Sequence, residues 1–245
     1  EVASINMLYG GASCGKKVLT SSSSPGISLM QEGISYIAGA ELPCLIVNVV
    51  RGGPGLGPIQ PSQADYFQSV KGGGHGDYKM IVLAPSSVQE MNDFVEIGFD
   101  LAFKYRMPAM ILSDGAIGQM MEKVELKDYT PRMTDKEIVD KYGEWATTGK
   151  TPDRNQNVIT SLEMDSAQME KNNHRLQEKY QTIPENEVRY EATQTDDAEY
   201  LMVAYGLSAR ICQKAVEIAR NKGHKVGMIR PITLFPFPEK KILEL

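Results

Sequence analysis

The stretch that decides the fold is KVLTSSSSPGISLMQEGISYIAGAELPCLIVNVV, residues 17–50. It opens with a short apolar run, Lys17–Thr20, and closes with a longer one, Cys44–Val50, and neither alternates strictly with polar residues. Such runs are typical of parallel strands covered on both faces. Between them, apolar residues recur at helical spacing behind a possible cap and a first-turn proline. These residues are Ile27, Met30, Ile34 and Ile37, behind Ser24 and Pro25.

The same alternation of strand and helix continues to about Leu126. Two further apolar runs, Met80–Ala84 and Ala109–Ser113, are predicted strands. Ser87, with Glu90 three residues later, has the spacing of a capping box and opens a helix. Its inward-facing residues are Met91, Phe94, Val95 and Phe99. The fold class predicted for residues 1–127 is therefore a layered α/β domain with a mostly parallel sheet flanked by helices.

Two further segments are expected after this domain. Residues 128–198 are rich in charged and amide side chains and predict a partly helical connector. It would hold a short helix opened by a capping box and a longer polar helix, at Thr134–Glu137 and Leu162–Tyr180. Residues 199–245 predict the start of a second α/β domain, incomplete because the sequence stops in what we expect to be mid-domain. Its elements are a strand at Leu201–Tyr205, a helix at Ser208–Lys222 capped by Gly223, and a strand at Lys225–Arg230.

Composition excludes several classes of function. The net charge of −5 and the scattered Lys and Arg residues leave no basic surface for nucleic acid. No apolar run approaches the roughly 20 residues that a membrane helix needs. The three cysteines contain no Cys-x-x-Cys pair for zinc or an iron–sulfur cluster, so we expect no metal site in this chain. A disulfide framework is equally unsupported, which favours a cytoplasmic location, and Cys44 is expected in the core.

Two loops are candidate binding sites because each follows a predicted strand. Thr20–Gly26 offers hydroxyl groups at the start of a helix, and Arg51–Gly57 places an arginine among glycines. Ligands of open α/β sheets bind outside the carboxyl ends of the strands, where glycine lets backbone and ligand approach closely. The plainer alternatives are a capped loop and a surface loop with a solvated arginine.

Other motifs carry less weight. Gly10–Lys16 nearly matches a phosphate-binding P-loop, but Lys17 stands where Ser or Thr is needed, and the predicted order of helix and strand is reversed. His75, in a glycine-rich turn, is a possible site residue or simply a solvated histidine. A serine hydrolase is not indicated, since the sequence has no Gly-x-Ser-x-Gly elbow.

Several strings occur together in the order of one family. They are Thr20–Gly33, Glu41–Pro43, Val47–Gly55, His75–Asp77 and Pro85–Met91, with a further match over Tyr205–Pro236. With them, the chain resembles the alpha subunit of 2-oxoacid:ferredoxin oxidoreductases. The first part resembles the pyrimidine-binding domain of these thiamine-diphosphate enzymes, and the last resembles the start of a transketolase C-terminal-type domain.

The resemblance implies roles for particular residues. Glu1 falls where the family has the glutamate that contacts the aminopyrimidine ring of thiamine diphosphate, and Arg51 where it has the arginine near the reacting 2-oxoacid. Ser21, Ser22, Ser23 and Ser24 are implied to line the pyrimidine side, and Gly52 and Gly53 to let the cofactor approach. A carboxyl group for proton exchange and a guanidinium for pairing with a carboxylate suit this chemistry.

The resemblance also implies partners. Thiamine enzymes hold the diphosphate and Mg²⁺ through Gly-Asp-Gly and a later Asn, but here Gly76-Asp77 is followed by Tyr78. We therefore expect a beta subunit that supplies the diphosphate site, Mg²⁺ and a cluster, with gamma and ferredoxin-like subunits. Coenzyme A and ferredoxin would accept the acyl group and the electrons. The favoured substrate is 2-oxoisovalerate, then 2-oxoglutarate. The alternatives are a non-oxidative thiamine-dependent lyase or transferase subunit and a non-catalytic scaffold.

Overall fold

A five-stranded sheet forms the centre of the molecule in the computed structural model, which describes residues 1–150, 152–153 and 155–245. The strand order is β1-β2-β4-β3-β8, and every neighbouring pair is parallel except β3 with β8. The strands are β1 (Leu19–Ser22), β2 (Cys44–Val50), β3 (Ile81–Leu83), β4 (Pro108–Asp114) and β8 (Thr233–Phe235). The predicted fold class, a mostly parallel sheet flanked by helices, is confirmed.

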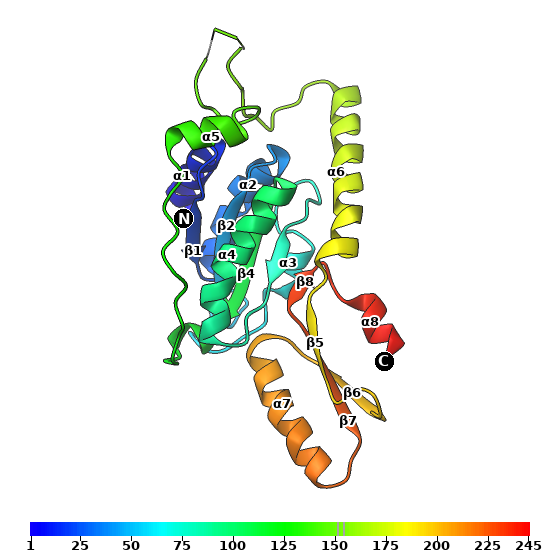
Figure 1. Cartoon of the computed structure of the whole chain (residues 1–245). Coiled ribbons are helices and arrows are strands. Elements are labelled where there is room, and N and C mark those ends of the chain that lie inside the picture. The colour runs from blue at the N-terminus through cyan, green and yellow to red at the C-terminus, as the bar shows by residue number, and fades with distance from the viewer. Residues whose placement is uncertain (151, 154) are drawn as a thin grey trace.

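Helices cover both faces of this sheet (Figure 1). Successive residues of β2 point to opposite sides: Cys44 and Ile46 pack with α1 (Val2–Ser13) and α2 (Pro25–Gly39) in one core. Leu45 and Val47 pack with α4 (Val88–Tyr105) in the other. This two-sided burial explains why β2 is almost wholly apolar. The core positions predicted for α2, namely Ile27, Met30, Ile34 and Ile37, are all buried.

The first strand begins and ends two residues later than predicted. Ser21 and Ser22 belong to β1, where they pair with Val47 and Asn48 of β2. Serine is not among the β-branched and aromatic residues that are enriched in strands, so it is the pairing with β2 that extends β1 over these two serines. The consequence is that only two of the four serines lie in the turn that enters α2.

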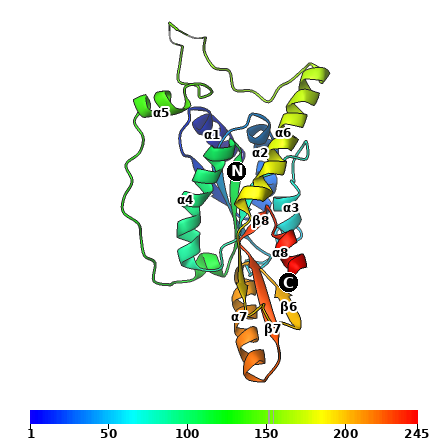
Figure 2. The ribbon, with the colours of Figure 1, turned by 45° about the vertical axis from the view of Figure 1, so that its right-hand side comes forward.

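Within the described residues, the connector predicted at 128–198 contains two helices. The capping box at Thr134 and Glu137 is confirmed and opens α5 (Asp135–Tyr142). Before it, the chain passes through a 3-10 turn, η1 (Ile117–Gln119), and then runs largely exposed along the outside of the sheet domain (Figure 2). The longer helix, α6 (Ser166–Glu187), starts and ends later than predicted, because Ile183 and Glu187 beyond Tyr180 are also buried.

A second sheet of three strands lies below the first in Figure 1. Its order is β5-β7-β6, with β5 antiparallel and β6 parallel to β7, and α7 packs against it. These elements are β5 (Tyr190–Thr193), β6 (Tyr200–Val203), α7 (Gly206–Asn221) and β7 (Val226–Pro231), followed after β8 by α8 (Glu239–Glu244).

The boundaries between the units differ from the predicted ones. β5 falls inside the predicted connector but belongs to the second sheet. β8 falls inside the predicted second domain but completes the first sheet beside β3. Both strands are short, three or four residues, and carry no alternation that would mark them in the sequence. Another short element that was not predicted is α3 (Tyr66–Val70).

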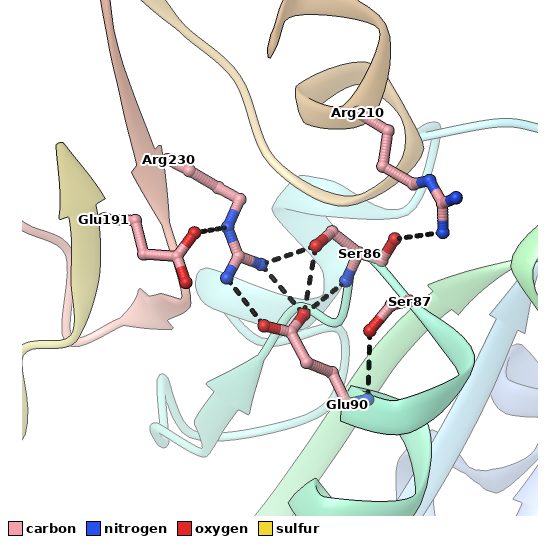
Figure 3. A network of polar contacts seen from close by, with 6 residues as sticks. All are labelled: Ser86, Ser87, Glu90, Glu191, Arg210 and Arg230. Carbon is pink, nitrogen blue, oxygen red and sulfur yellow. Dashed lines mark hydrogen bonds and ion pairs between the residues drawn. The ribbon is translucent and has the colours of Figure 1, made fainter. Parts of the chain in front are cut away.

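The two units are joined by a network around Arg230 of β7 (Figure 3). Its guanidinium is 5% exposed and bonds to Glu90 at 2.6 and 2.9 Å, to Ser86 at 2.9 Å and to Glu191 at 3.0 Å. The predicted capping box of α4 is therefore only half correct. The Ser87 hydroxyl accepts from the Glu90 N–H, but the Glu90 carboxylate binds Ser86 and Arg230 instead of the Ser87 N–H.

Candidate functional site

The two predicted binding loops lie side by side. β1 and β2 are parallel neighbours, and their last paired residues are Ser22 and Asn48. The serine turn that follows β1 therefore meets the loop that starts at Arg51 after β2. Both emerge at the carboxyl end of the sheet, which is where ligands of open α/β sheets bind.

Glu1 lies against this same place, at the start of α1. Its carboxylate accepts a hydrogen bond from the Ser22 hydroxyl at 3.2 Å, and the residue is exposed. Their close approach to α2 depends on Gly26, since a Cβ atom there would lie 2.0 Å from Ser22 Oγ and 2.7 Å from Glu1 Oε1. The Glu1 carboxylate, the Ser22 hydroxyl and Gly26, which has no side chain, thus form a small polar cluster, called the cradle below.

Ser24 occupies the N-cap position of α2, as predicted, but its side chain caps nothing. The residue is 9% exposed and has a φ of 24°, a left-handed conformation that is unusual for serine. Its hydroxyl contacts Asp65 at 2.7 Å, and it accepts from the Arg51 N–H at 3.0 Å. Its own N–H donates to Asn48 Oδ1 at 3.1 Å. Among the four serines, Ser24 is therefore committed to protein partners.

The other three serines are more open. Ser21 is exposed, while Ser22 and Ser23 are half-buried. Of the three, Ser22 has the contact with Glu1 already described. They remain predicted cofactor-lining residues, and Ser22 has the best position for that role because it borders the cradle.

Arg51 begins a tight loop. Its Nε is buried without a hydrogen-bond partner among the described residues. The loop turns back at once, because the Gly52 N–H donates to Pro58 O at 3.1 Å. Gly57 has a φ of +61° and a Cβ there would lie 1.3 Å from Gly52 O, so only glycine fits this turn. The buried unpaired nitrogen is a donor that an incoming anion can satisfy.

His75 lies in a different part of the domain. It is exposed, and its backbone N–H donates to Ser35 Oγ at 2.8 Å. Ser35 is eleven residues along α2 from Ser24, or about 16 Å at the rise of an α-helix. The structure therefore ties the His75 backbone to α2 away from the serine turn.

Two residues of this site were missed in the sequence. Asn48 is fully buried, and its amide joins the Ser24 N–H to Asp65, to which it donates at 3.1 Å. Asp65 is the residue before α3. The one available signal was Asn48 itself, a polar residue within an otherwise apolar strand. Asp65 gives no local signal, since its partners are 17 and 41 residues away.

A hollow of about 470 Å³ lies elsewhere, between the start of α4 and α7. Its charges are already paired: Arg210 binds Glu122 at 2.8 Å and donates to Ser86 O at 3.2 Å (Figure 3). Within the described part of the chain no group of three or more His, Cys, Asp or Glu side chains is placed to hold a metal ion. The same residues contain no helix long and apolar enough to cross a membrane. The cradle beside Arg51 is therefore the better candidate site.

The donor set at the cradle suits two chemical groups. The Glu1 carboxylate has room for a further hydrogen-bond donor, as a nitrogen heterocycle with an amino group would provide. The Arg51 guanidinium has an unsatisfied donor for a carboxylate or phosphate. Both groups fit the residues present, and neither requires a metal ligand from this chain.

Comparison with known proteins identifies relatives over the whole chain. A family model described as "Pyruvate flavodoxin/ferredoxin oxidoreductase, thiamine diP-bdg" matches residues 1–210, and one described as "Pyruvate:ferredoxin oxidoreductase core domain II" matches residues 198–245. The ketoisovalerate oxidoreductase subunit VorB of Methanothermobacter thermautotrophicus is 53% identical over 100% of this chain and 68% of its own length. The 2-oxoglutarate synthase subunit KorA of Methanocaldococcus jannaschii is 36% identical over 100% of this chain and 71% of its own.

A solved structure shares the fold. It is a 2-oxoglutarate:ferredoxin oxidoreductase from Magnetococcus marinus with 2-oxoglutarate, coenzyme A and succinyl-CoA bound, with a TM-score of 0.79 and 26% sequence identity. The match covers 97% of the present chain and 45% of that one. The chain thus spans about two thirds of the length of its ketoisovalerate relative and less than half of the solved chain.

Proposed function

Because this chain belongs to the pyruvate flavodoxin/ferredoxin oxidoreductase family, in its thiamine-diphosphate-binding part, we propose that it supplies the pyrimidine side of a thiamine-diphosphate site. The proposed reaction is the oxidative decarboxylation of a 2-oxoacid to an acyl-coenzyme A, with reduction of ferredoxin. The observation that carries the proposal is that Glu1, the serine turn and Arg51 meet at the carboxyl ends of β1 and β2.

Glu1 is proposed to hold the aminopyrimidine. Its carboxylate lies against Gly26 at the start of α2, where the Ser22 hydroxyl orients it. A carboxyl group in this position can accept or return a proton at a ring nitrogen. When bound, thiamine diphosphate supplies the carbon nucleophile and the electron sink that decarboxylation of a 2-oxoacid requires. Ser21, Ser22 and Ser23, with Gly52 and Gly53, are the proposed lining of this side.

Arg51 is proposed to orient the substrate. A guanidinium can pair with the carboxylate of a 2-oxoacid through two parallel hydrogen bonds, which fixes the 2-oxo carbon relative to the cofactor. The unpaired Nε supports this role, because a bound carboxylate would satisfy it.

The favoured substrate is 2-oxoisovalerate, since the ketoisovalerate subunits are 53% identical to this chain and the 2-oxoglutarate subunits 31–36%. The relatives are named as subunits, which supports assembly with partners. We assign the diphosphate site, Mg²⁺ and iron–sulfur clusters to a beta subunit and a ferredoxin-like subunit, with a gamma subunit completing the complex.

The direct test is to purify the complex with its native partners and to measure ferredoxin reduction with 2-oxoisovalerate and with 2-oxoglutarate. We expect coenzyme-A-dependent reduction and a higher kcat/KM for 2-oxoisovalerate. A preference for 2-oxoglutarate would overturn the substrate assignment. Turnover without ferredoxin reduction would favour the non-oxidative lyase or transferase alternative.

Replacing the arginine tests the role of the chain in the site. Arg51→Ala should lower kcat/KM for the 2-oxoacid about 10- to 100-fold, as expected for the loss of a charge-assisted hydrogen bond. Arg132→Ala, at an exposed arginine outside the site, is the control and should leave activity unchanged. If Arg51→Ala assembles normally and keeps full activity, the role assigned to Arg51 is wrong and the scaffold alternative is favoured.

A further inference from the structure

Two helix N-cap residues, Ser24 and Asp65, bind each other instead of capping their own helices. Ser24 precedes α2 and Asp65 precedes α3, and neither side chain makes a capping hydrogen bond. Serine and aspartate at this position normally accept from a backbone N–H in the first turn of the helix. Here the Ser24 hydroxyl and the Asp65 carboxylate meet at 2.7 Å. Because of this one contact, α2 and α3 both begin without a side-chain cap.

The protons of this network have one consistent arrangement. Ser24 Oγ lies 2.7 Å from Asp65 Oδ2 and 3.4 Å from Arg51 O, and it has a single proton to donate. The shorter contact to the carboxylate takes that proton, because charge-assisted hydrogen bonds are the stronger ones. The lone pairs of Ser24 Oγ are then directed to the Arg51 N–H, which donates at 3.0 Å.

Asn48 links the other two members of this network, Ser24 and Asp65. It is fully buried in β2, accepts from the Ser24 N–H at 3.1 Å and donates to Asp65 Oδ2 at 3.1 Å. The same carboxylate oxygen therefore receives two hydrogen bonds, from the Ser24 hydroxyl and the Asn48 amide. These contacts hold Ser24 at its φ of 24°. A residue persists in such a conformation only where its surroundings determine it.

We propose that Asp65, together with Asn48, is a positioning residue that sets the place of Arg51 through Ser24. Asp65 does not touch the substrate. It orients the Ser24 hydroxyl, which fixes the backbone of Arg51 at the point where the chain leaves β2. The inference rests on the proposed function, in which Arg51 binds the 2-oxoacid carboxylate.

The decisive comparison is between Asp65→Ala and Asp65→Asn in the assembled complex. Asparagine can place its amide oxygen where Oδ2 lies and accept both hydrogen bonds, whereas alanine accepts neither. Asp65→Ala should raise KM for the 2-oxoacid about tenfold, because loss of the network misplaces Arg51. KM for coenzyme A should stay within about twofold, as no coenzyme A contact is assigned to this network. Asp65→Asn should restore KM for the 2-oxoacid to within about twofold of wild type.

A matched control separates positioning from general destabilisation. Glu187 is another buried carboxylate that accepts two side-chain hydrogen bonds, from Lys104 at 2.6 Å and Tyr105 at 2.8 Å, at the end of α6. Glu187→Gln should lower the Tm without changing KM for the 2-oxoacid. Equilibrium binding of the 2-oxoacid to each complex gives a readout independent of turnover and should follow KM.

Each outcome decides the proposal. An active wild type with an unchanged KM in Asp65→Ala would overturn the positioning role and leave the proposed function standing. An Asp65→Asn variant as impaired as Asp65→Ala would overturn it too, because charge rather than hydrogen-bond geometry would then matter. A wild-type complex without 2-oxoacid turnover would overturn both proposals. If Asp65→Ala fails to assemble, Ser24→Ala takes its place, since it removes the same link to Arg51.

Discussion

At the scale of single residues, the candidate site depends on small side chains as much as on charged ones. The Glu1 carboxylate and the Ser22 hydroxyl approach the first turn of α2 only because residue 26 is glycine. This glycine lies inside the helix, so its role is to leave space and not to supply an unusual backbone conformation. Gly26 has no functional group, but the placement of Glu1 depends on it.

Gly26→Ala should weaken cofactor binding without lowering the Tm. The added methyl group would meet Ser22 Oγ and Glu1 Oε1, and we expect displacement of both to weaken thiamine-diphosphate binding by the complex about tenfold. The Tm should change little, since alanine is favoured in helices. Binding is measured by calorimetric titration of the assembled complex with the cofactor.

The control for this change is Gly10→Ala, at a helical glycine with nothing within 4 Å of the added atom. It should stabilise the chain by about 0.5–1 kcal/mol and leave cofactor affinity unchanged. Equal effects of the two variants on affinity would contradict the assigned role of Gly26.

At the scale of elements, α6 shows how a polar helix is held on an apolar domain. Few of its side chains are buried, but Arg175 and Lys179 both bind Glu41, two residues after α2, at 2.5 and 2.7 Å. Burial raises the pKa of Glu41, while hydrogen bonds from Arg175 and Lys179 lower it, and the net result lies below the ordinary value of 4.5. The carboxylate is therefore charged and paired at neutral pH.

This pairing predicts a dependence of stability on pH. A carboxyl group whose pKa is lower in the folded chain stabilises the fold above its unfolded pKa and loses that contribution as pH falls through the folded value. The free energy of unfolding of the wild-type chain should thus decrease below the ordinary Glu pKa of 4.5. Glu41→Gln should cost about 2 kcal/mol at pH 7, as for the loss of hydrogen bonds to a charged group, and show a shallower decrease in acid, measured by urea denaturation.

An exposed carboxylate provides the comparison. The pKa of Glu96 is lowered by a hydrogen bond from Lys127, but both side chains are largely in solvent. Glu96→Gln should change the unfolding free energy little at either pH, because water screens the pair. Identical pH profiles for the two variants would show that Glu41 does not hold α6 in place.

At the scale of the whole molecule, neither sheet is built from one continuous stretch of the chain that excludes the other. The chain crosses from the first sheet to the second and then returns, so that β8 completes the first sheet after β7 has completed the second. Leu234 of β8 is 2% exposed and belongs to the core beneath α1 and α2. The Arg230 network adds a polar junction between the same units (Figure 3). We therefore expect the units to unfold together.

Leu234→Ala tests whether β8 is needed for the first core. Removing a buried leucine should destabilise the chain by about 2–5 kcal/mol. The only tryptophan, Trp145, packs against the first core and reports its unfolding in urea. Leu243→Ala, at an 80% exposed residue of α8, is the control and should have no effect. An unchanged Trp145 transition in Leu234→Ala would show that β8 is not needed for the first core.

Much of the first unit follows from local sequence. The apolar run Cys44–Val50 predicts a buried strand, and all seven of its residues are in β2. The helical spacing behind Pro25 predicts α2, and Thr134 with Glu137 predicts the start of α5. These succeed because burial of a periodic apolar face and closure of a capping box involve residues only a few positions apart.

The sequence by itself determined the α/β class, the family resemblance and the placing of both candidate binding loops after neighbouring strands. Only the tertiary structure decided that the Ser24 hydroxyl hydrogen-bonds to Asp65 and Arg51 instead of capping α2. It also decided that the Glu90 carboxylate binds Arg230, and which sheet β5 and β8 join. The physical reason is the same in each case. A hydroxyl, a carboxylate or a short strand has several possible partners, and the partner it takes is a residue far along the chain that folding brings within hydrogen-bond distance.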